Sequence, residues 1–194
     1  MLTADWRRAL IPVTATYPFS IALNQEGPWG LGVFSRFPLD SPQTTDLGMP
    51  GSFNVIATVA FPGGAVRLAA VHLSSPTLPG RAARRNRQLL RLAELLGAQK
   101  PAIPRLLVGD LNTTPFSPYF RDLIERTGMH DARRGRGLLG TWPRWLPLLQ
   151  IPIDHCIADA ALTVTSVKRG PGVGSDHYPL EIRLRRRDQR EIPR

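Results

Sequence analysis

The alternation of apolar and polar positions along the chain predicts a strand-rich protein. Residues 52–61 alternate in this way, the Pro62-Gly63-Gly64 sequence is typical of a turn, and residues 65–73 resume the strand pattern. This succession predicts a β-hairpin. Two shorter strands are predicted at residues 17–23 and 30–35, on either side of a turn-rich segment.

Two segments show the spacing of amphipathic helices instead. Residues 81–96 carry leucines on one face and arginines on the other, and Gly97 is placed to end this helix. Residues 117–127 predict a second helix, with Ser117 as its N-cap and Pro118 at its first position. The leucine stripe of the first helix consists of Leu89, Leu92, Leu95 and Leu96.

The remaining apolar runs predict four more strands, at residues 105–108, 151–157, 162–168 and 178–184. Because the strands are grouped with few helices between them, we expect an α+β fold. Its expected form is a four-layer α/β/β/α sandwich, in which two stacked, mainly antiparallel sheets are flanked by helices. The domain is expected to span residues 1–184, and residues 185–194 to form a frayed basic tail without apolar periodicity.

The composition is that of a globular protein. At 194 residues, with 42% hydrophobic and 21% charged residues, the chain is long enough for one domain with a real core. No apolar run approaches the roughly 18 residues of a membrane-spanning helix, and a soluble protein, cytoplasmic by default, is therefore expected. The single cysteine, Cys156, excludes an intramolecular disulfide, and its apolar neighbours predict a buried thiol.

The charge indicates an anionic partner. The formal net charge is +10, and all but two of the 25 basic residues are arginine. The planar donor fork of arginine matches phosphate oxygens, which favours a phosphorylated partner. Base composition or selection for heat tolerance also enriches arginine, so charge alone is only weak support for binding to nucleic acid.

Four short motifs lie at the ends of predicted strands: VHL at 71–73, GDLN at 109–112, IDH at 153–155 and GSDH at 174–177. Taken singly, most have an ordinary structural explanation, because strand-edge histidines pack against neighbours and Asp or Asn side chains cap turns. Asp154 is less ordinary, since an unpaired carboxylate in an apolar strand is costly unless something compensates it.

In this order and spacing, with Arg85 and Gln88 on the intervening helix, the motifs resemble the endonuclease/exonuclease/phosphatase superfamily. Residues 30–39 and 141–143 are also similar to segments of that superfamily, and the resemblance covers residues 6–184. Its members include DNase I, exonuclease III-type nucleases, sphingomyelinases and inositol polyphosphate phosphatases. The resemblance therefore implies a metal-dependent hydrolase of phosphate esters.

The resemblance also implies catalytic roles for particular residues. Asp110 would orient or deprotonate the attacking water, and Asn112 would hold a phosphate oxygen. His177, supported by Asp154, would be the essential histidine that stabilises the phosphate, because a carboxylate on one ring nitrogen favours the cationic imidazole. His72 would contact the phosphate or protonate the leaving group.

Metal and substrate contacts follow from the same resemblance. The implied metal ligands are Asp110, Asn112 and Asp176. All are hard oxygen donors, so Mg²⁺ or Mn²⁺ is the expected cofactor. The implied substrate contacts are Arg85, Asn112 and His72.

The chain departs from the family pattern at its N-terminus. A full domain of this family begins with a strand carrying Asn, then a helix, then a strand ending in a metal-binding Glu. By spacing from residues 6–10, that Glu falls near Met1, and the loop context of Glu26 does not match it. We therefore expect an N-terminally incomplete domain, with sheet edges exposed by the missing strands that favour a homodimer.

Three functions remain open at this point. The first is a Mg²⁺-dependent phosphodiesterase acting on DNA or RNA, which the net charge of +10 favours over enzymes of zwitterionic lipids. The second is a phosphatase or phosphodiesterase acting on inositol phosphates or phospholipids. The third is a nucleic-acid-binding module whose catalysis is weakened by loss of the Glu.

Overall fold

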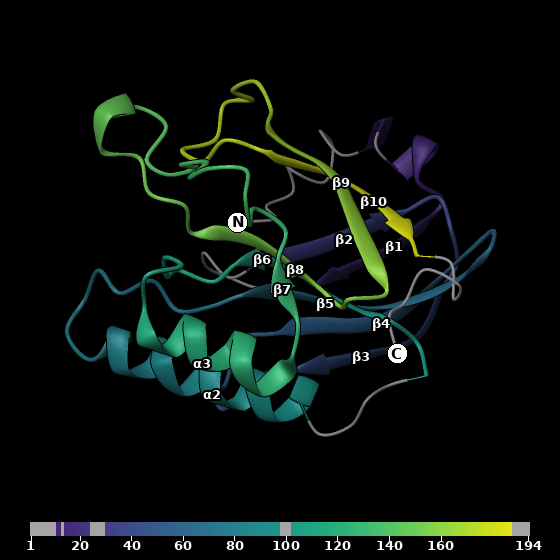
Figure 1. Cartoon of the computed structure of the whole chain (residues 1–194), viewed down its shortest axis with the longest axis horizontal. Helices are drawn as coiled ribbons and strands as arrows, with labels where there is room; N and C mark the ends of the chain where they lie inside the picture. Colours follow the sequence, from purple (N-terminus) through teal and green to yellow (C-terminus); the bar gives the residue numbers. More distant parts are fainter. Residues whose placement is uncertain (1–10, 13, 24–29, 98–101, 188–194) are drawn as a thin grey trace.

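A computed structural model describes residues 11–12, 14–23, 30–97 and 102–187 of the chain (Figure 1). Its centre is a six-stranded sheet in which β5 and β6 are parallel and all other neighbours are antiparallel. In spatial order the strands are β3 (Leu39–Thr45), β4 (Asn54–Phe61), β5 (Gly64–His72), β6 (Arg105–Asp110), β8 (Asp154–Ala158) and β7 (His130–Asp131).

Two helices cover one face of this sheet. Figure 1 shows α2 (Arg81–Gly97) and α3 (Pro118–Thr127) side by side along it. The apolar side chains between helices and sheet form the largest core cluster of the described residues, and burial of this apolar area favours folding. Its members include Val71, Leu73, Leu89, Leu92, Leu107, Leu111, Phe120, Leu123 and Ile157.

Two antiparallel ribbons cover the opposite face. One pairs β1 (Phe19–Leu23) with β2 (Leu31–Ser35), and the other pairs β9 (Leu162–Arg169) with β10 (Leu180–Arg186). Each ribbon packs apolar side chains on the central sheet, and a cavity of about 620 Å³ lies between β2 and β10. The stacked sheets with few helices confirm the α+β class.

Most expected elements are confirmed, with shifted bounds. The hairpin is β4–β5, and both helices form. The strand expected from residue 151 begins only at Asp154, because Pro152 cannot donate to a ladder and Ile151 makes an isolated bridge to Trp142. Toward the C-terminus, Arg185 and Arg186 belong to β10 rather than to a frayed tail, since their backbone pairs with β9.

Other details differ from the sequence pattern. Strand β3 was not expected, since Pro42 lies within it and its register shifts beside that proline, but an edge strand tolerates both. Leu95 is exposed rather than part of the buried stripe of α2. The Ser117 side chain makes no capping hydrogen bond at α3. Cys156 is buried as expected, and no helix of the described chain is long and apolar enough to cross a bilayer.

A single buried guanidinium joins the sheet to both helices. Arg105, at the start of β6, binds Asp159 through Nη2–Oδ1 at 2.7 Å and Nε–Oδ2 at 3.0 Å. The same group donates hydrogen bonds to the carbonyls of Leu96 and Thr127, in the last turns of α2 and α3. Helix C-termini carry partial negative charge, so this position suits a cation.

We expect Arg105→Ala to lower the free energy of unfolding by about 3–5 kcal/mol, because it leaves the Asp159 carboxylate without its cation and two carbonyls without their donor. Urea denaturation followed by circular dichroism measures this change. The control is Arg91→Ala, which breaks an exposed pair with Glu94 and should cost at most about 1 kcal/mol. Equal, small effects of the two substitutions would show that Arg105 does not join the layers.

A buried histidine supports the loop that follows β6. His155 is only 2% exposed, and its Nε2–H donates to the Thr113 carbonyl at 2.8 Å. Its Nδ1 accepts a hydrogen bond from Arg133 Nη2 at 2.6 Å. Burial, with the adjacent Arg133 charge, lowers the pKa of His155 to about 4. A neutral imidazole therefore holds the loop that follows Asn112, through its hydrogen bond to the Thr113 carbonyl.

This histidine should make stability depend on pH. Its pKa is about 4 when folded and about 6.5 when unfolded, so the unfolded chain binds the proton in between. The contribution of neutral His155 to the free energy of unfolding is fully present above pH 6.5. It is lost as pH falls toward 4, by up to about 1.4 kcal/mol per pH unit. In His155→Gln, the free energy of unfolding should fall less steeply between pH 7.5 and pH 5 than in the wild type. Parallel curves in urea titrations would contradict the assignment.

Candidate active site

Three polar side chains form a row across adjacent strand ends. His72 is the last residue of β5 and pairs in register with Asp110, the last residue of β6. Asp110 in turn pairs with Asp154, the first residue of β8. His72 Nε2 lies 3.8 Å from Asp110 Oδ2. The sheet therefore places three titratable groups along one edge.

The backbone around Asp110 has a conformation that few residues can adopt. Gly109 has a φ of +137°, and a Cβ there would collide with the Val71 carbonyl oxygen. Asn112 is in the left-handed region, with a φ of +49°, where Asn is better tolerated than most residues. The backbone N–H of Asn112 donates to Asp110 Oδ1 at 2.7 Å. The backbone conformation at Gly109 and Asn112, together with this hydrogen bond, thus fixes the orientation of the Asp110 carboxylate.

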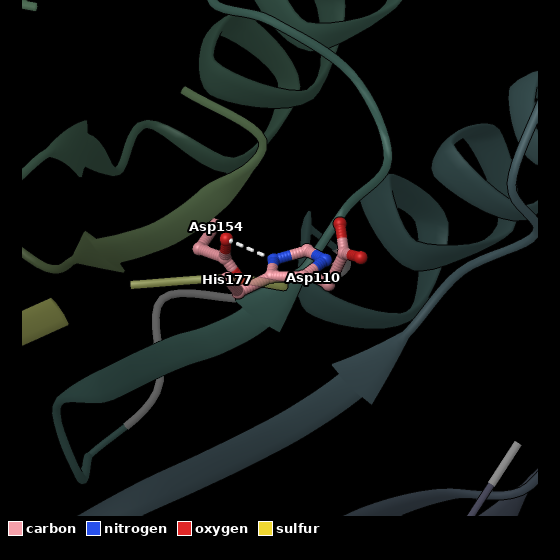
Figure 2. Close-up of side chains that lie close together, drawn as sticks. All are labelled: Asp110, Asp154 and His177. Atoms are coloured by element: carbon pink, nitrogen blue, oxygen red, sulfur yellow. Dashed lines mark hydrogen bonds and ion pairs between the residues drawn. The ribbon is translucent and has the colours of Figure 1, made fainter. Parts of the chain in front are cut away.

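A second layer supplies the histidine that completes the site. His177 lies just before β10, and its Nδ1–H donates to Asp154 Oδ2 at 2.8 Å. Figure 2 shows the His177 ring between the carboxylates of Asp154 and Asp110. The resemblance implied that Asp154 supports His177, and the hydrogen bond between them also joins the β9–β10 ribbon to the central sheet.

The loop that carries His177 is held by the segment before β8. The Trp142 indole N–H donates to Asp176 Oδ2 at 3.2 Å, and the Arg144 backbone N–H donates to the Asp176 carbonyl at 2.8 Å. The Tyr178 N–H donates to the carbonyl of Thr141, which is fully buried. These bonds orient Asp176 and His177 toward the sheet edge.

Most of the predicted residues lie together in one cleft of about 380 Å³. Five of them line it directly: His72, Asp110, Asn112, Asp176 and His177. Ser75, Pro76, Thr77, Trp142, Ile151 and Ile153 complete its walls. Asp154 does not line this cleft but borders the neighbouring cavity, and it acts on the cleft through its hydrogen bond to His177 and through its charge beside Asp110.

Two of the predicted substrate contacts, Arg85 and Asn112, make hydrogen bonds within the protein. Arg85 Nη1 donates to the Asn112 carbonyl at 2.7 Å, so the guanidinium supports the loop. The Asn112 amide donates to the Leu73 carbonyl and to Asp110 Oδ2, at 2.9 and 3.0 Å. Its Oδ1 remains as an acceptor, which suits a cation better than a phosphate oxygen. Contact of either side chain with substrate stays a prediction.

The two central carboxylates have opposite pKa shifts. Burial, and next the charge of Asp154, raise the pKa of Asp110 to about 7. Burial also acts to raise the pKa of Asp154, but hydrogen bonds from His177 and Thr141 prevail and lower it. Asp154 is therefore the permanent anion of the pair, and Asp110 is able to exchange a proton near neutral pH.

The two histidines also differ. Burial acts to lower the pKa of His177, but the hydrogen bond and charge of Asp154 prevail and raise it. Burial and the nearby His177 lower the pKa of His72. The site therefore pairs a histidine that favours the cationic form with one that favours the neutral form.

The donor set fits a hard divalent cation. Ligand atoms of Asp110, Asp154 and His177 lie within 4.8 Å of one another. Asp154 and His177 share a hydrogen bond, whereas the oxygen donors of Asp110, Asp176 and Asn112 line the cleft together, and these three residues remain the predicted metal ligands. The raised pKa of Asp110 is consistent with excess negative charge that a cation would neutralise.

Sequence reasoning missed Asn54 and the roles of Thr141 and Trp142. The Asn54 side chain is fully buried, and its Oδ1 accepts the His72 backbone N–H at 3.0 Å. The signal available in the sequence for Asn54 was a polar residue at the start of an apolar strand. For Thr141 and Trp142, the similarity of residues 141–143 to the family was the signal. Residues 1–10 and Glu26 lie outside the described part of the chain.

Comparison with solved structures shows the same fold in several proteins. An endonuclease/exonuclease/phosphatase from Beutenbergia cavernae is 24% identical, with a TM-score of 0.70 over 93% of this chain and 57% of that one. Zebrafish (D. rerio) TDP2 complexed with a single-strand DNA product is 15% identical, with a TM-score of 0.74 over 95% and 83%. The human Nocturnin catalytic domain with bound sulfate is 17% identical, with a TM-score of 0.71 over 93% and 78%.

This chain thus spans little more than half the length of the Beutenbergia protein. The comparison with curated proteins finds no match. The model of the Endonuclease/Exonuclease/phosphatase family matches residues 3–177, which include all the residues of the cleft. The chain therefore belongs to the endonuclease/exonuclease/phosphatase family.

Proposed function

We propose that this chain is a divalent-metal-dependent phosphodiester hydrolase whose substrate is a nucleic acid. The superfamily is hydrolytic and includes nucleases, phosphodiesterases and sphingomyelinases. The observation that carries the proposal is the Asp154–His177 hydrogen bond beside the partly buried Asp110. This arrangement provides a proton acceptor for water and a cationic donor for phosphate at one place.

In the proposed reaction, a water oxygen bonds to phosphorus while the water proton passes to Asp110. The pKa of about 7 allows this carboxylate to accept a proton near neutral pH. The bond from phosphorus to the leaving oxygen breaks, and that oxygen takes up a proton from solvent water. The lowered pKa of His72 favours a neutral imidazole, which suits hydrogen bonding to the phosphate better than proton donation.

His177 is proposed to stabilise the phosphate as negative charge builds up on its oxygens. Asp154 engages Nδ1, so Nε2 remains to donate a hydrogen bond on the side of Asp110 (Figure 2). A preorganised cationic donor of this kind is an effective source of transition-state stabilisation. Asp154 acts here as a positioning residue, because it fixes the ring and favours its charged form.

Asp110, Asn112 and Asp176 are proposed to hold Mg²⁺ or Mn²⁺. When bound, the ion supplies charge neutralisation at the phosphate oxygens. A bound ion would also make a nearby water more acidic, so that Asp110 would accept its proton more readily.

Nucleic acid is the proposed substrate because the chain is rich in arginine and carries a net charge of +10. The structural likeness to TDP2, which was solved with a single-strand DNA product, supports this choice. The second candidate is the phosphodiester of a phospholipid headgroup or an inositol phosphate. It is favoured by the apolar walls of the cleft, formed by Trp142, Ile151 and Ile153.

The test is plasmid nicking beside hydrolysis of a nonspecific phosphodiester dye, each with Mg²⁺, Mn²⁺ or EDTA. Nicking that EDTA abolishes supports the proposed function. A salt-sensitive gel shift without cleavage supports a binding module instead. Hydrolysis of inositol phosphates or phospholipids, without nicking, supports the second candidate.

Self-association through a sheet edge stays a prediction. Among the described strands, β2 pairs only with β1 and β10 only with β9. Residues of β2 and β10 both line the cavity between the ribbons. Strands with a free edge can pair with another chain, which is the basis for proposing a homodimer.

We expect His177→Ala and Asp110→Asn each to lower metal-dependent hydrolysis at least about a hundredfold, because each removes a group that acts in the transition state. Initial rates on the dye substrate at saturating Mg²⁺ measure this. The exposed Arg91→Ala, far from the cleft, is the control and should leave the rate unchanged. Near-full activity of His177→Ala would show that the assigned roles are wrong.

We expect Asp176→Asn to weaken Mg²⁺ binding by roughly tenfold or more, because it removes one of few charged ligands. Isothermal titration of the protein with Mg²⁺, in the absence of substrate, measures the affinity directly. Asp122→Asn provides a matched control, since Asp122 pairs with Arg126 on α3 and lies outside the cleft. An unchanged affinity in Asp176→Asn would exclude Asp176 as a ligand.

A further inference from the structure

The loop between Trp142 and β8 exposes a group of large apolar side chains. It contains a short 3-10 helix, η1 (Pro147–Leu149), which Figure 1 shows at the end of a projecting loop. Trp145, Leu148 and Leu149 are 68%, 95% and 66% exposed. We refer to Trp145, Leu146, Leu148 and Leu149 as the apolar tip. Exposed side chains of this kind, when contiguous, mark interaction surfaces.

The apolar tip belongs to a larger surface beside the cleft. Arg144 Nε donates to the Ser175 carbonyl at 2.7 Å, which ties the loop of the tip to the loop before His177. Val173, on that second loop, is 66% exposed. Ile151 follows the tip in sequence, is partly exposed, and lines the catalytic cleft. The apolar surface therefore extends to the cleft itself.

Basic residues outnumber acidic ones around the apolar tip. Residues 141–153 include Arg144 and no acidic residue, and residues 168–179 include Lys168 and Arg169, with Asp176 as the one acidic residue. Arg169 is exposed, with its guanidinium 4.3 Å from the centre of the Tyr178 ring. The surface thus combines aliphatic and indole groups with arginine, and its charge is complementary to an anionic partner.

We propose that the apolar tip docks this protein onto the surface of an anionic lipid bilayer. Tryptophan and leucine partition together into the bilayer interface, and neighbouring basic residues are attracted to anionic headgroups. Docking brings the catalytic cleft close to the headgroup region, because Ile151 adjoins both the tip and the cleft. This proposal is independent of the substrate that the cleft hydrolyses.

The chemistry of the tip favours a bilayer over other partners. Single-stranded nucleic acid is bound on aromatic stacking platforms, whereas the tip presents three leucines for one tryptophan. A stable protein interface needs a broad complementary surface. The most exposed part of this surface, the tip, is instead a single turn at the end of a projecting loop.

The test is sedimentation of the 194-residue chain with vesicles in EDTA, so that binding is measured without catalysis. Vesicles of phosphatidylglycerol should bind the protein, and vesicles of phosphatidylcholine should bind it much more weakly. Leu148→Asp should weaken binding at least about tenfold, because it places a charge at the inserted point. Leu95→Asp on α2 is the matched control, with the same change in composition and net charge at another exposed leucine.

A second probe reports on the tip directly. Brominated phosphatidylglycerol should quench tryptophan fluorescence in the wild type, and Trp145→Phe should remove most of that quenching. Thermal melts establish that each variant is folded. Equal binding by Leu148→Asp and Leu95→Asp, or equal quenching with and without Trp145, overturns the proposal. The proposal is also overturned by a different pattern, in which the wild-type protein does not bind vesicles. In that pattern, Leu148→Asp instead abolishes binding to single-stranded DNA or dissociates a dimer seen by light scattering.

Discussion

The hydrogen bond between Asp154 and His177 is the interaction on which the site depends, because it joins two layers of the fold. Asp154 belongs to the central sheet and His177 to the loop entering β10. Apolar packing of the β9–β10 ribbon around Cys156 sets the separation of these layers. A close-packed core transmits small displacements, so the hydrogen-bond length is determined by packing as much as by the polar groups themselves.

This one bond also determines how charge is distributed in the cleft. It lowers the pKa of Asp154 and raises that of His177, which leaves Asp110 as the carboxylate whose pKa rises with burial. Neighbouring carboxylates whose environments separate their pKa values can take different roles. The fold therefore provides one fixed anion, one favoured cation and one group that exchanges a proton.

The segment between residues 141 and 151 connects the cleft to the exposed apolar tip. At one end, Trp142 orients Asp176 through its indole N–H, and at the other, Ile151 lines the cleft. Between them the chain leaves the body of the protein and exposes the apolar tip. The residues that hold the loop of His177 and those proposed to contact a bilayer thus belong to one continuous stretch of chain. A surface bound by the tip would therefore lie close to the cleft.

The sequence by itself determined the elements with strong local periodicity and the order of the motifs. The β4–β5 hairpin, α2 and the position of Asp110 at a strand end all follow from neighbours a few residues apart. Tertiary structure alone decided the pairing of Arg185 with β9 and the exposure of Leu148. It also decided that Arg85 supports the Asn112 carbonyl. These features depend on partners that are distant in sequence, and local patterns do not encode which distant groups meet.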